Sequence, residues 1–248
     1  MEIPSEENRE THFRVELKFP DEKNTSNYKS LNFRLLGEMK MTVALLTAAG
    51  SGTRMGQDIP KQFIHVDNKP VIIHTMEAFQ KHPSVDAIMV VTIPSWIEVV
   101  KAYAKQFNIS KLRWVVAGGK TGQESIYNGL KSLENEIPSN SIVMIHDGNR
   151  CMVSGEIISD SIATFHKYGS AVTAIPCVEA VFRSDDDGIS SVDSIPREQL
   201  FRTQTPHTYT LEKLLDAHKR QRKKHYKHGC YVYANASIRR NCLFFQGI

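Results

Sequence analysis

The chain has 248 residues, of which 41% are hydrophobic and 23% are charged, an ordinary composition for a globular protein. No apolar run approaches the ~20 residues that a membrane helix needs, and the first residues lack the pattern of a signal peptide. The formal net charge of +4 is concentrated near the end, in KRQRKKHYKH, so the remainder is close to neutral. We therefore expect neither a membrane nor a nucleic-acid partner.

The sequence divides into three regions of different character. Residues 1–40 are polar and charged without a sustained hydrophobic period, and we interpret them as a poorly ordered extension, with Met39 or Met41 as a candidate natural start. Residues 41–220 alternate regularly between apolar and amphipathic stretches. Residues 221–248 show neither helical nor strand periodicity. The four cysteines lack C-x-x-C spacing, which suggests neither a zinc site nor a disulfide framework and favours the cytoplasm.

The central region predicts five strands and four helices in alternation, which is typical of a doubly wound α/β fold with a mostly parallel sheet covered on both faces. The predicted strands are TVALLTA (42–48), VDAIMVVTI (85–93), LRWVVAGG (112–119), SIVMIHDGNR (141–150) and SAVTAIPCV (170–178). The predicted helices are KPVIIHTMEAFQKH (69–82), SWIEVVKAYAKQF (95–107), GQESIYNGLKSLENEI (122–137) and SGEIISDSIATFHKYG (154–169). The first helix should bury Val71, Ile72, Thr75, Met76 and Phe79.

The stretch from about 177 to 203 differs from this regular pattern. It contains DDDG at 185–188, which is a turn signal between two short runs, and we predict a hairpin there. Ligands of open α/β sheets bind at the carboxyl ends of the strands. That rule selects four loops as candidate binding segments: 47–60, 93–96, 117–125 and 147–151.

The loop after the first strand has a chemistry that suits phosphate. Gly50 and Gly52 allow backbone N–H groups to approach an anion closely, because no Cβ atom stands in the way. The spacing matches neither G-x-G-x-x-G nor a Walker loop. Arg54 and Lys61 follow, and two cations beside an amide cradle suit a triphosphate whose charge grows as a nucleophile attacks. The alternative is a glycine turn with solvated surface cations.

Four motifs together resemble the sugar- and polyol-phosphate cytidylyltransferases, the family of 2-C-methyl-D-erythritol 4-phosphate cytidylyltransferase and ribitol-5-phosphate cytidylyltransferase. They are AAGSGTRMGQDIPKQF (48–63), GGKTGQESIYNGL (118–130), IHDGNR (145–150) and IPREQLFRTQTPHTY (195–209), so the resemblance runs from residue 42 to about 220. It implies a Rossmann-like nucleotidyltransferase fold. It also implies that CTP and a polyol phosphate give a CDP-polyol and pyrophosphate, by in-line attack of the substrate phosphate on the α-phosphorus.

The resemblance also implies residue roles. Arg54 and Lys61 match the catalytic cations, and Asp147 matches the ligand of Mg²⁺, although a turn cap is an alternative for it. Arg150 follows in the same loop and matches a substrate-binding position. Arg197 matches the arginine that grips the substrate phosphate, and because the family's arm crosses to a second subunit, a homodimer is implied; a surface ion pair is the alternative. The positions that match nucleotide contacts are Ala48, Ala49, Gly50, Ser51, Gly52, Gly119, Ser125 and Gly148.

Three residues depart from the family pattern: Gly122 stands where arginine is common, Ala180 where threonine is usual, and Cys151 where proline is common. The first two weaken any transfer of the substrate. We expect 2-C-methyl-D-erythritol 4-phosphate, as in isoprenoid precursor synthesis. Ribitol 5-phosphate for cell-surface polymers, another sugar phosphate, and a nucleotide-binding homologue with impaired catalysis remain alternatives.

The end of the chain prompts a further hypothesis. Family members continue with a strand and a helix, whereas residues 221–248 show no such pattern. Codons permitted for residues 224–248, read one nucleotide later, give a peptide that resembles the missing segment. We therefore interpret 221–248 as a frameshifted tail. On that hypothesis the sheet loses a strand, the site loses a cation, and the enzyme is destabilised and impaired.

Overall fold

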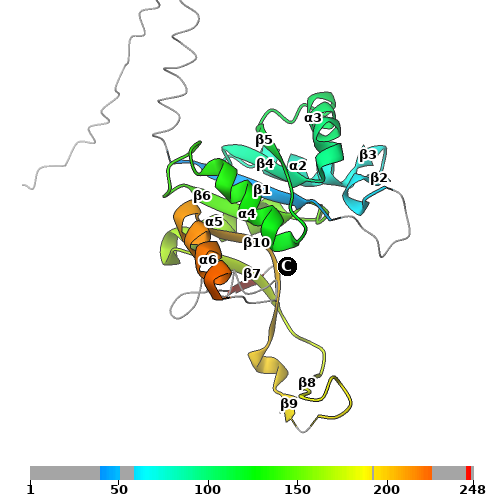
Figure 1. Cartoon of the computed structure of the whole chain (residues 1–248), viewed down its shortest axis with the longest axis vertical. Coiled ribbons are helices and arrows are strands. Elements are labelled where there is room, and N and C mark those ends of the chain that lie inside the picture. The colour runs from blue at the N-terminus through cyan, green and yellow to red at the C-terminus, as the bar shows by residue number, and fades with distance from the viewer. Residues whose placement is uncertain (1–39, 51–58, 192, 225–243, 247–248) are drawn as a thin grey trace, which may run out of the picture. The chain divides into compact units, whose positions relative to one another are not determined.

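A computed structural model describes residues 40–50, 59–191, 193–224 and 244–246. The predicted extension, apart from Lys40, and most of the predicted tail therefore lie outside the described residues. Within the described part, the core is a seven-stranded sheet in the order β11-β7-β10-β6-β1-β4-β5 (Figure 1). Its strands are β1 (Thr42–Ala48), β4 (Ala87–Thr92), β5 (Leu112–Ala117), β6 (Ile142–Asp147), β7 (Ala171–Pro176), β10 (Phe201–Thr210) and β11 (Phe244–Gln246).

The apolar runs form the strands that the sequence predicted. β1 is central and pairs in parallel with β4 and β6, and its backbone is buried over almost its whole length. Successive side chains of β1 point to opposite faces, so that Leu46 joins one core and Leu45 the other. A strand that is buried on both faces must be mostly apolar, which is why the sequence TVALLTA predicted a strand clearly.

Helices cover both faces of the sheet, which confirms the doubly wound α/β prediction. The helices are α2 (Val71–Lys81), α3 (Ile97–Gln106), α4 (Gly122–Leu133), α5 (Gly155–Tyr168) and α6 (Leu211–Lys224). α2, α3 and α5 pack on one core through residues such as Phe79 and Ile158, and α4 and α6 pack on the other through Leu130 and Leu214. In α2, Ile73 is fully buried and Val71 only half-buried, so the buried face is shifted slightly from the predicted one.

β10 was not predicted. It runs antiparallel to both β6 and β7 and so inserts one reversed strand into an otherwise parallel sheet. Its sequence, FRTQTPHTYT, has no apolar run, because its first residues are exposed beside the arm and only its second half enters the core. Tyr209, at its far end, is fully buried.

The predicted hairpin arm is present. β8 (Val181–Arg183) and β9 (Asp193–Ile195) pair antiparallel, with Phe182 opposite Ser194. The DDDG segment supplies the left-handed backbone of the connection, with φ of 56° at Asp187 and 90° at Gly188. In Figure 1 the arm projects away from the sheet.

The tail is partly ordered into the fold. α6 continues to Lys224, past the predicted boundary at 220, and β11 pairs in parallel with β7 at the edge of the sheet. The expectation that the tail supplies no strand is therefore wrong for residues 244–246. Three residues can join a ladder through their backbone alone, and so short a strand leaves no periodicity to detect. The frameshift hypothesis otherwise concerns residues outside the described ranges.

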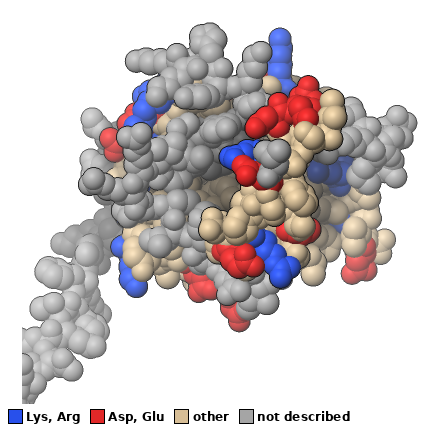
Figure 2. Space-filling view, turned by 90° about the horizontal axis from the view of Figure 1, so that it is seen from below, with Lys and Arg blue, Asp and Glu red and all other residues tan. Residues whose placement is uncertain are grey.

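Short elements complete the described structure: β2 (His65–Val66), β3 (Lys69–Pro70), and the 3-10 turns η2 (Lys61–Phe63), η3 (Pro94–Trp96) and η4 (Arg197–Gln199). Among the described helices, none is long and apolar enough to cross a lipid bilayer. On the face shown in Figure 2, basic and acidic side chains of the described residues are interspersed rather than gathered by sign.

Candidate functional site

A cleft of about 360 Å³ lies at the carboxyl ends of β1, β5 and β6. Three of the four predicted loops contribute to it, and the loop at 93–96 does not. Trp96 from that loop instead stacks on Phe63, the neighbour of the lining residue Gln62, with ring centroids 4.0 Å apart and planes 5° from parallel. The lining residues are Thr47, Ala48, Ala49, Gly50, Lys61, Gln62, Gly119, Lys120, Thr121, Gly122, Ser125, Asp147 and Asn149.

The first glycine loop is anchored by a residue that the sequence analysis did not select. The Gln62 side-chain amide donates to the carbonyl oxygens of Ala48 (2.6 Å) and Gly50 (3.0 Å). The Thr92 hydroxyl also lies 3.4 Å from the Ala48 oxygen. These bonds direct the carbonyl oxygens of Ala48 and Gly50, which would repel an anion, toward donor groups of the protein. Of the predicted residues, Ala48, Ala49 and Gly50 line the cleft, whereas Ser51, Gly52 and Arg54 lie outside the described residues.

Lys61 stands at the mouth of the cleft on the tight turn η2. Its two neighbours in the turn, Gln62 and Phe63, are both buried, while Lys61 itself is exposed and lines the cleft. Pro60 precedes the turn with φ −60°, the value its ring favours. The buried side chains of Gln62 and Phe63 thus anchor the turn that carries Lys61, the predicted catalytic cation.

The second glycine loop joins β5 to the N-terminus of α4. Thr121 caps the helix, because its hydroxyl accepts from the Glu124 N–H at 3.1 Å, and the Glu124 carboxylate accepts from the Lys120 N–H at 2.7 Å. The Gly119 N–H donates to the Ser125 hydroxyl at 3.0 Å. Gly119 and Ser125 therefore lie together at the N-terminal end of α4, where the helix dipole favours negative charge.

Two glycines are required by close approach of the loops to one another. A Cβ on Gly118 would lie 2.3 Å from the Cβ of Ala49, and a Cβ on Gly148 would lie 2.9 Å from the Thr47 carbonyl oxygen. At Gly122, by contrast, a Cβ would meet nothing within 4 Å. The cleft is therefore open at the position where arginine is common in the family.

Asp147 and Arg150 form an ion pair at the end of β6. The Asp147 carboxylate accepts from the Arg150 Nε at 2.7 Å and from the Thr47 hydroxyl at 3.3 Å. The Arg150 guanidinium also donates to the Gln204 side-chain oxygen. The Asp147 side chain is 41% exposed, and a pair this open to water contributes only ~0–1 kcal/mol. Asp147 can therefore exchange partners at little cost.

Two buried histidines contact the backbone near the Asp147–Arg150 ion pair. Burial lowers the pKa of both His146 and His207 from 6.5 to about 4, so both are neutral near pH 7. His146 Nε2 lies 3.0 Å from the Arg150 carbonyl oxygen, and His207 Nε2 contacts the Gln204 carbonyl oxygen. Through these contacts the two histidines hold the backbone on either side of the Arg150–Gln204 hydrogen bond, which is a structural role.

A second hollow, of about 460 Å³, adjoins the cleft on the far side of Asn149, which lines both. Arg150, Cys151 and Gln204 line it, so the Asp147–Arg150 loop separates the two spaces. Ala180 is exposed and lines neither of them.

Arg197 is not brought to the cleft of its own chain. It lies on the turn η4 beside the arm, its side chain is 64% exposed, and its Nε lies 3.4 Å from the Glu198 carboxylate. The described chain alone thus places it in the surface ion pair that was the alternative reading of this residue.

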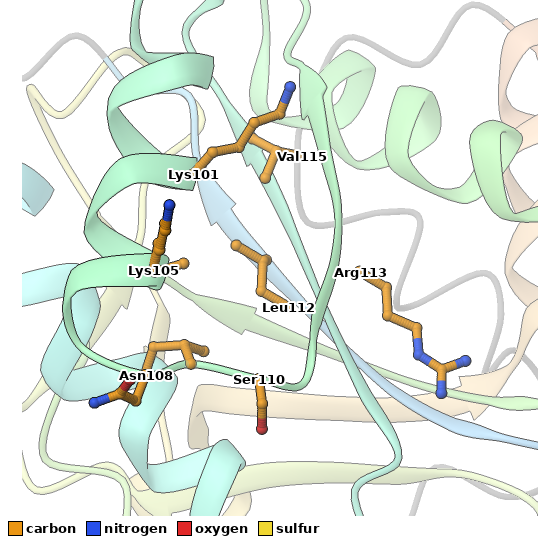
Figure 3. A pocket seen from close by; sticks show the side chains of 9 residues that line it. Lys101, Lys105, Asn108, Ser110, Leu112, Arg113 and Val115 are labelled. Atoms are coloured by element: carbon orange, nitrogen blue, oxygen red, sulfur yellow. The ribbon is translucent and has the colours of Figure 1, made fainter.

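A third groove, of about 500 Å³, lies between α3 and β5 and is larger than the cleft. Lys101 and Lys105 extend along the groove while Arg113 points away from it (Figure 3), so its charged groups do not converge on one point. None of the predicted site residues lines it. We therefore place the candidate site at the smaller cleft.

Comparison with known proteins gives one consistent result. Residues 42–242 match the family model described as 2-C-methyl-D-erythritol 4-phosphate cytidylyltransferase, a range that passes residue 220, where the motif resemblance ends. The chain is 39% identical to a ribitol-5-phosphate cytidylyltransferase of Lacticaseibacillus paracasei, over 72% of this chain and 76% of that one. It is 40% identical to a protein of the same name from Vibrio parahaemolyticus, over 78% and 79% of the two chains.

A 2-C-methyl-D-erythritol 4-phosphate cytidylyltransferase of Clostridium botulinum is 36% identical, over 76% of this chain and 80% of that one. Among solved structures, the 4-diphosphocytidyl-2C-methyl-D-erythritol synthase of Anaerococcus prevotii superposes with a TM-score of 0.71 at 22% identity, covering 84% and 90% of the two chains. That structural likeness supports the fold.

Proposed function

This chain belongs to the 2-C-methyl-D-erythritol 4-phosphate cytidylyltransferase family of nucleotidyltransferases, and from that premise we propose that it transfers CMP from CTP to a polyol phosphate and releases pyrophosphate. The observation that carries the proposal is the cleft at the ends of β1, β5 and β6. Residues of the first glycine loop and of the N-terminal end of α4 line this cleft together with Lys61 and Asp147.

The chemistry requires no side-chain nucleophile. The substrate phosphate attacks the α-phosphorus of CTP in line, so the protein must hold the two phosphates together and neutralise the charge that develops. We propose that Lys61 and Arg54 supply that neutralisation and that the first glycine loop, from Ala48 to Gly52, holds the nucleotide's phosphates through its backbone. Gly119 and Ser125, at the end of α4, hold the cytidine side, and Gly148 keeps the aspartate loop close to β1.

We propose that Mg²⁺ is bound through Asp147. Among the described residues that line the cleft, Asp147 is the one that carries a carboxylate. The Asp147 oxygens are hard donors at the cleft wall, which suits Mg²⁺ that takes its other ligands from phosphate and water. The ion would neutralise phosphate charge when bound.

Replacing Asp147 by asparagine keeps the shape but removes the charge. We expect a loss of activity of at least about 10- to 100-fold at limiting Mg²⁺, because loss of a residue that only supports a metal ligand already lowers metal affinity by this order. Titration of activity against Mg²⁺ measures the effect, and Asp160→Asn on the exposed face of α5 is the matched control. An unchanged Mg²⁺ dependence in Asp147→Asn would show that the ion is held elsewhere.

We propose 2-C-methyl-D-erythritol 4-phosphate as the polyol substrate, in accord with the family model. Ribitol 5-phosphate is the second candidate, because the relatives at 39% and 40% identity carry that name. Each polyol phosphate should be incubated separately with CTP and Mg²⁺, and the CDP-polyol identified by mass. Exclusive formation of CDP-ribitol would overturn the first choice while keeping the reaction class. As CTP is a cytoplasmic nucleotide, we propose that the enzyme works there.

We propose that the enzyme is a homodimer in which each arm serves the partner's site. The arm exposes Val178 (68%), Phe182 (64%) and Ile189 (88%) to solvent in the single chain, more apolar surface than so small a hairpin can keep in water at no cost. It also carries Arg197, which lies away from the cleft of its own chain. A second copy of the chain would cover the exposed apolar side chains and would receive Arg197 at its own cleft.

Mixed dimers test this arrangement directly. Lys61→Ala and Arg197→Ala should each be nearly inactive alone, yet a co-expressed mixture should recover about a quarter of wild-type activity per site. The reason is that a heterodimer then contains one site with an intact Lys61 and an intact Arg197. Mixing Lys61→Ala with Lys61→Arg is the control and should show no more than the average of the two variants' separate activities. Absence of recovery in a mixture shown to contain heterodimers would place Arg197 in its own chain's site.

A further inference from the structure

We propose that Gln62 is a positioning residue, which fixes the start of the first glycine loop, Ala48 to Gly50, to the turn carrying Lys61, so that both bind the anion as one unit. The inference deepens the proposed function and rests on it, since it concerns the same cleft. Gln62 was not among the residues that the sequence analysis assigned to the site.

The contacts of Gln62 are unusual for a surface-loop residue. Its side chain is only 2% exposed, although it lines the cleft beside Lys61. Its amide nitrogen bonds two carbonyl oxygens, of Ala48 and Gly50, which lie on either side of Ala49. A single NH₂ group thus uses both of its hydrogens to fix three consecutive residues at the end of β1.

These bonds also tie together two segments that lie far apart along the chain. Gln62 is 14 residues from Ala48 and 12 from Gly50, so its side chain clamps the start of the loop to its end. The turn itself is held by the stacking of Phe63 on Trp96. Lys61 is the exposed member of the same three-residue turn, and its position relative to the glycine loop is therefore set through Gln62.

The clamp also has an electrostatic consequence. A carbonyl oxygen pointing into the cleft would repel a phosphate, whereas an oxygen that accepts a bond from a buried amide is directed away from it. No other neutral side chain except asparagine offers two hydrogens on one nitrogen, and asparagine is one methylene shorter. The geometry thus requires a glutamine at this position.

The first test is Gln62→Met, which keeps the length and removes both hydrogen bonds. A misplaced Lys61 and loop should lower kcat/KM for CTP by about 100-fold, with kcat falling as well as KM rising. The matched control is Gln80→Met on α2, because Gln80 also bonds a backbone group, the Lys111 N–H at 2.9 Å, but lies away from the cleft. That control should leave kcat and KM unchanged even where the unfolding midpoint falls.

The second test is Gln62→Glu, whose shape matches glutamine. An ionised carboxylate would face two carbonyl oxygens and a triphosphate, so the activity at pH 8 should fall further than in Gln62→Met. Burial among these oxygens raises the pKa of a carboxyl group, and the protonated form donates one hydrogen bond. The ratio of Gln62→Glu to wild-type activity, taken at each pH, should therefore rise as pH falls from 8 to 6.

A third measurement does not depend on turnover. Hydrogen exchange at the Phe63 amide, which donates to the Pro60 carbonyl oxygen at 2.8 Å in the turn that carries Lys61, should accelerate in Gln62→Met and stay unchanged in Gln80→Met. If wild type proves inactive with every polyol phosphate, the proposed function fails, and the exchange result still decides the role of Gln62. The inference is overturned if Gln62→Met and Gln62→Glu keep kcat and KM within twofold of wild type, or if the Phe63 amide exchanges at the wild-type rate in Gln62→Met.

Discussion

Replacement of Lys61 by alanine should lower kcat by about 100- to 1,000-fold, with a smaller change in KM for CTP. Lys61 is the exposed member of a turn whose other residues are buried, so its side chain can reach into the cleft without moving the backbone. Charge grows on the phosphoryl oxygens as the substrate attacks, and the interaction with a fixed cation is therefore stronger in the transition state than in bound CTP. A group of this kind affects kcat more than binding.

The measurement is steady-state pyrophosphate release under saturating CTP, together with CTP affinity by equilibrium binding. Lys101→Ala is the control, since Lys101 is exposed on α3, pairs with Glu98 and lies away from the cleft. Lys61→Arg should retain more activity than Lys61→Ala because it keeps the positive charge. A Lys61→Ala enzyme with wild-type kcat would remove this lysine from the catalytic machinery and leave the cleft as a binding site only.

The free energy of unfolding should fall steeply as the pH drops from 6.5 toward 4. The folded protein holds His146 and His207 neutral, with each pKa lowered to about 4 by burial, whereas the unfolded chain protonates both near pH 6.5. The unfolded state therefore binds more protons throughout this window, and acid favours it. The loss for each histidine is on the order of 3 kcal/mol by pH 4, and above pH 7 this contribution is constant.

Chemical denaturation of the metal-free protein at a series of pH values measures the effect. His207→Gln removes one titrating group and keeps a side-chain donor near the Gln204 carbonyl oxygen, so its stability should depend less steeply on pH. His166→Gln, at an exposed position of α5, should retain the wild-type slope. A flat dependence in the wild-type protein would mean that these histidines titrate alike in the folded and unfolded states.

The sequence predicted those parts of the fold that repeat a pattern over several residues. β1 and β6 are buried on both faces and must be continuously apolar, and the helices that cover them must be amphipathic. β10 was not predicted because its burial changes along its length, from the exposed Phe201 to the buried Tyr209. No single hydrophobic period therefore describes its sequence. β11 is too short to carry a period at all.

The candidate site was predictable at the level of loops, because the carboxyl ends of parallel strands meet at one edge of a sheet. Lys61, Asp147, Gly119 and Ser125 indeed line one cleft. Gln62 was missed because its importance lies in a contact between segments that are distant along the chain, which no local spacing reveals. The signal available was a polar residue between Lys61 and a buried Phe63, in a turn next to a glycine loop.

The position of Arg197 could not be decided from the sequence for a different reason. Its place depends on where the arm lies in an assembly, and a single chain contains no pattern that fixes a second copy. The same holds for the polyol substrate. Gly122 leaves open space in the cleft and Ala180 lines neither hollow, so neither residue supplies a group that selects one polyol.

Release of pyrophosphate from CTP with Mg²⁺ and a polyol phosphate tests the central claim most directly. The account predicts release that requires CTP, the ion and either 2-C-methyl-D-erythritol 4-phosphate or ribitol 5-phosphate, and that is largely lost in Lys61→Ala. The same assay on a chain in which residues 221–248 are replaced by the alternative reading of their codons would test the frameshift hypothesis. CTP binding without pyrophosphate release, in both the present chain and the one with the replaced tail, would contradict the account and leave a nucleotide-binding protein in its place.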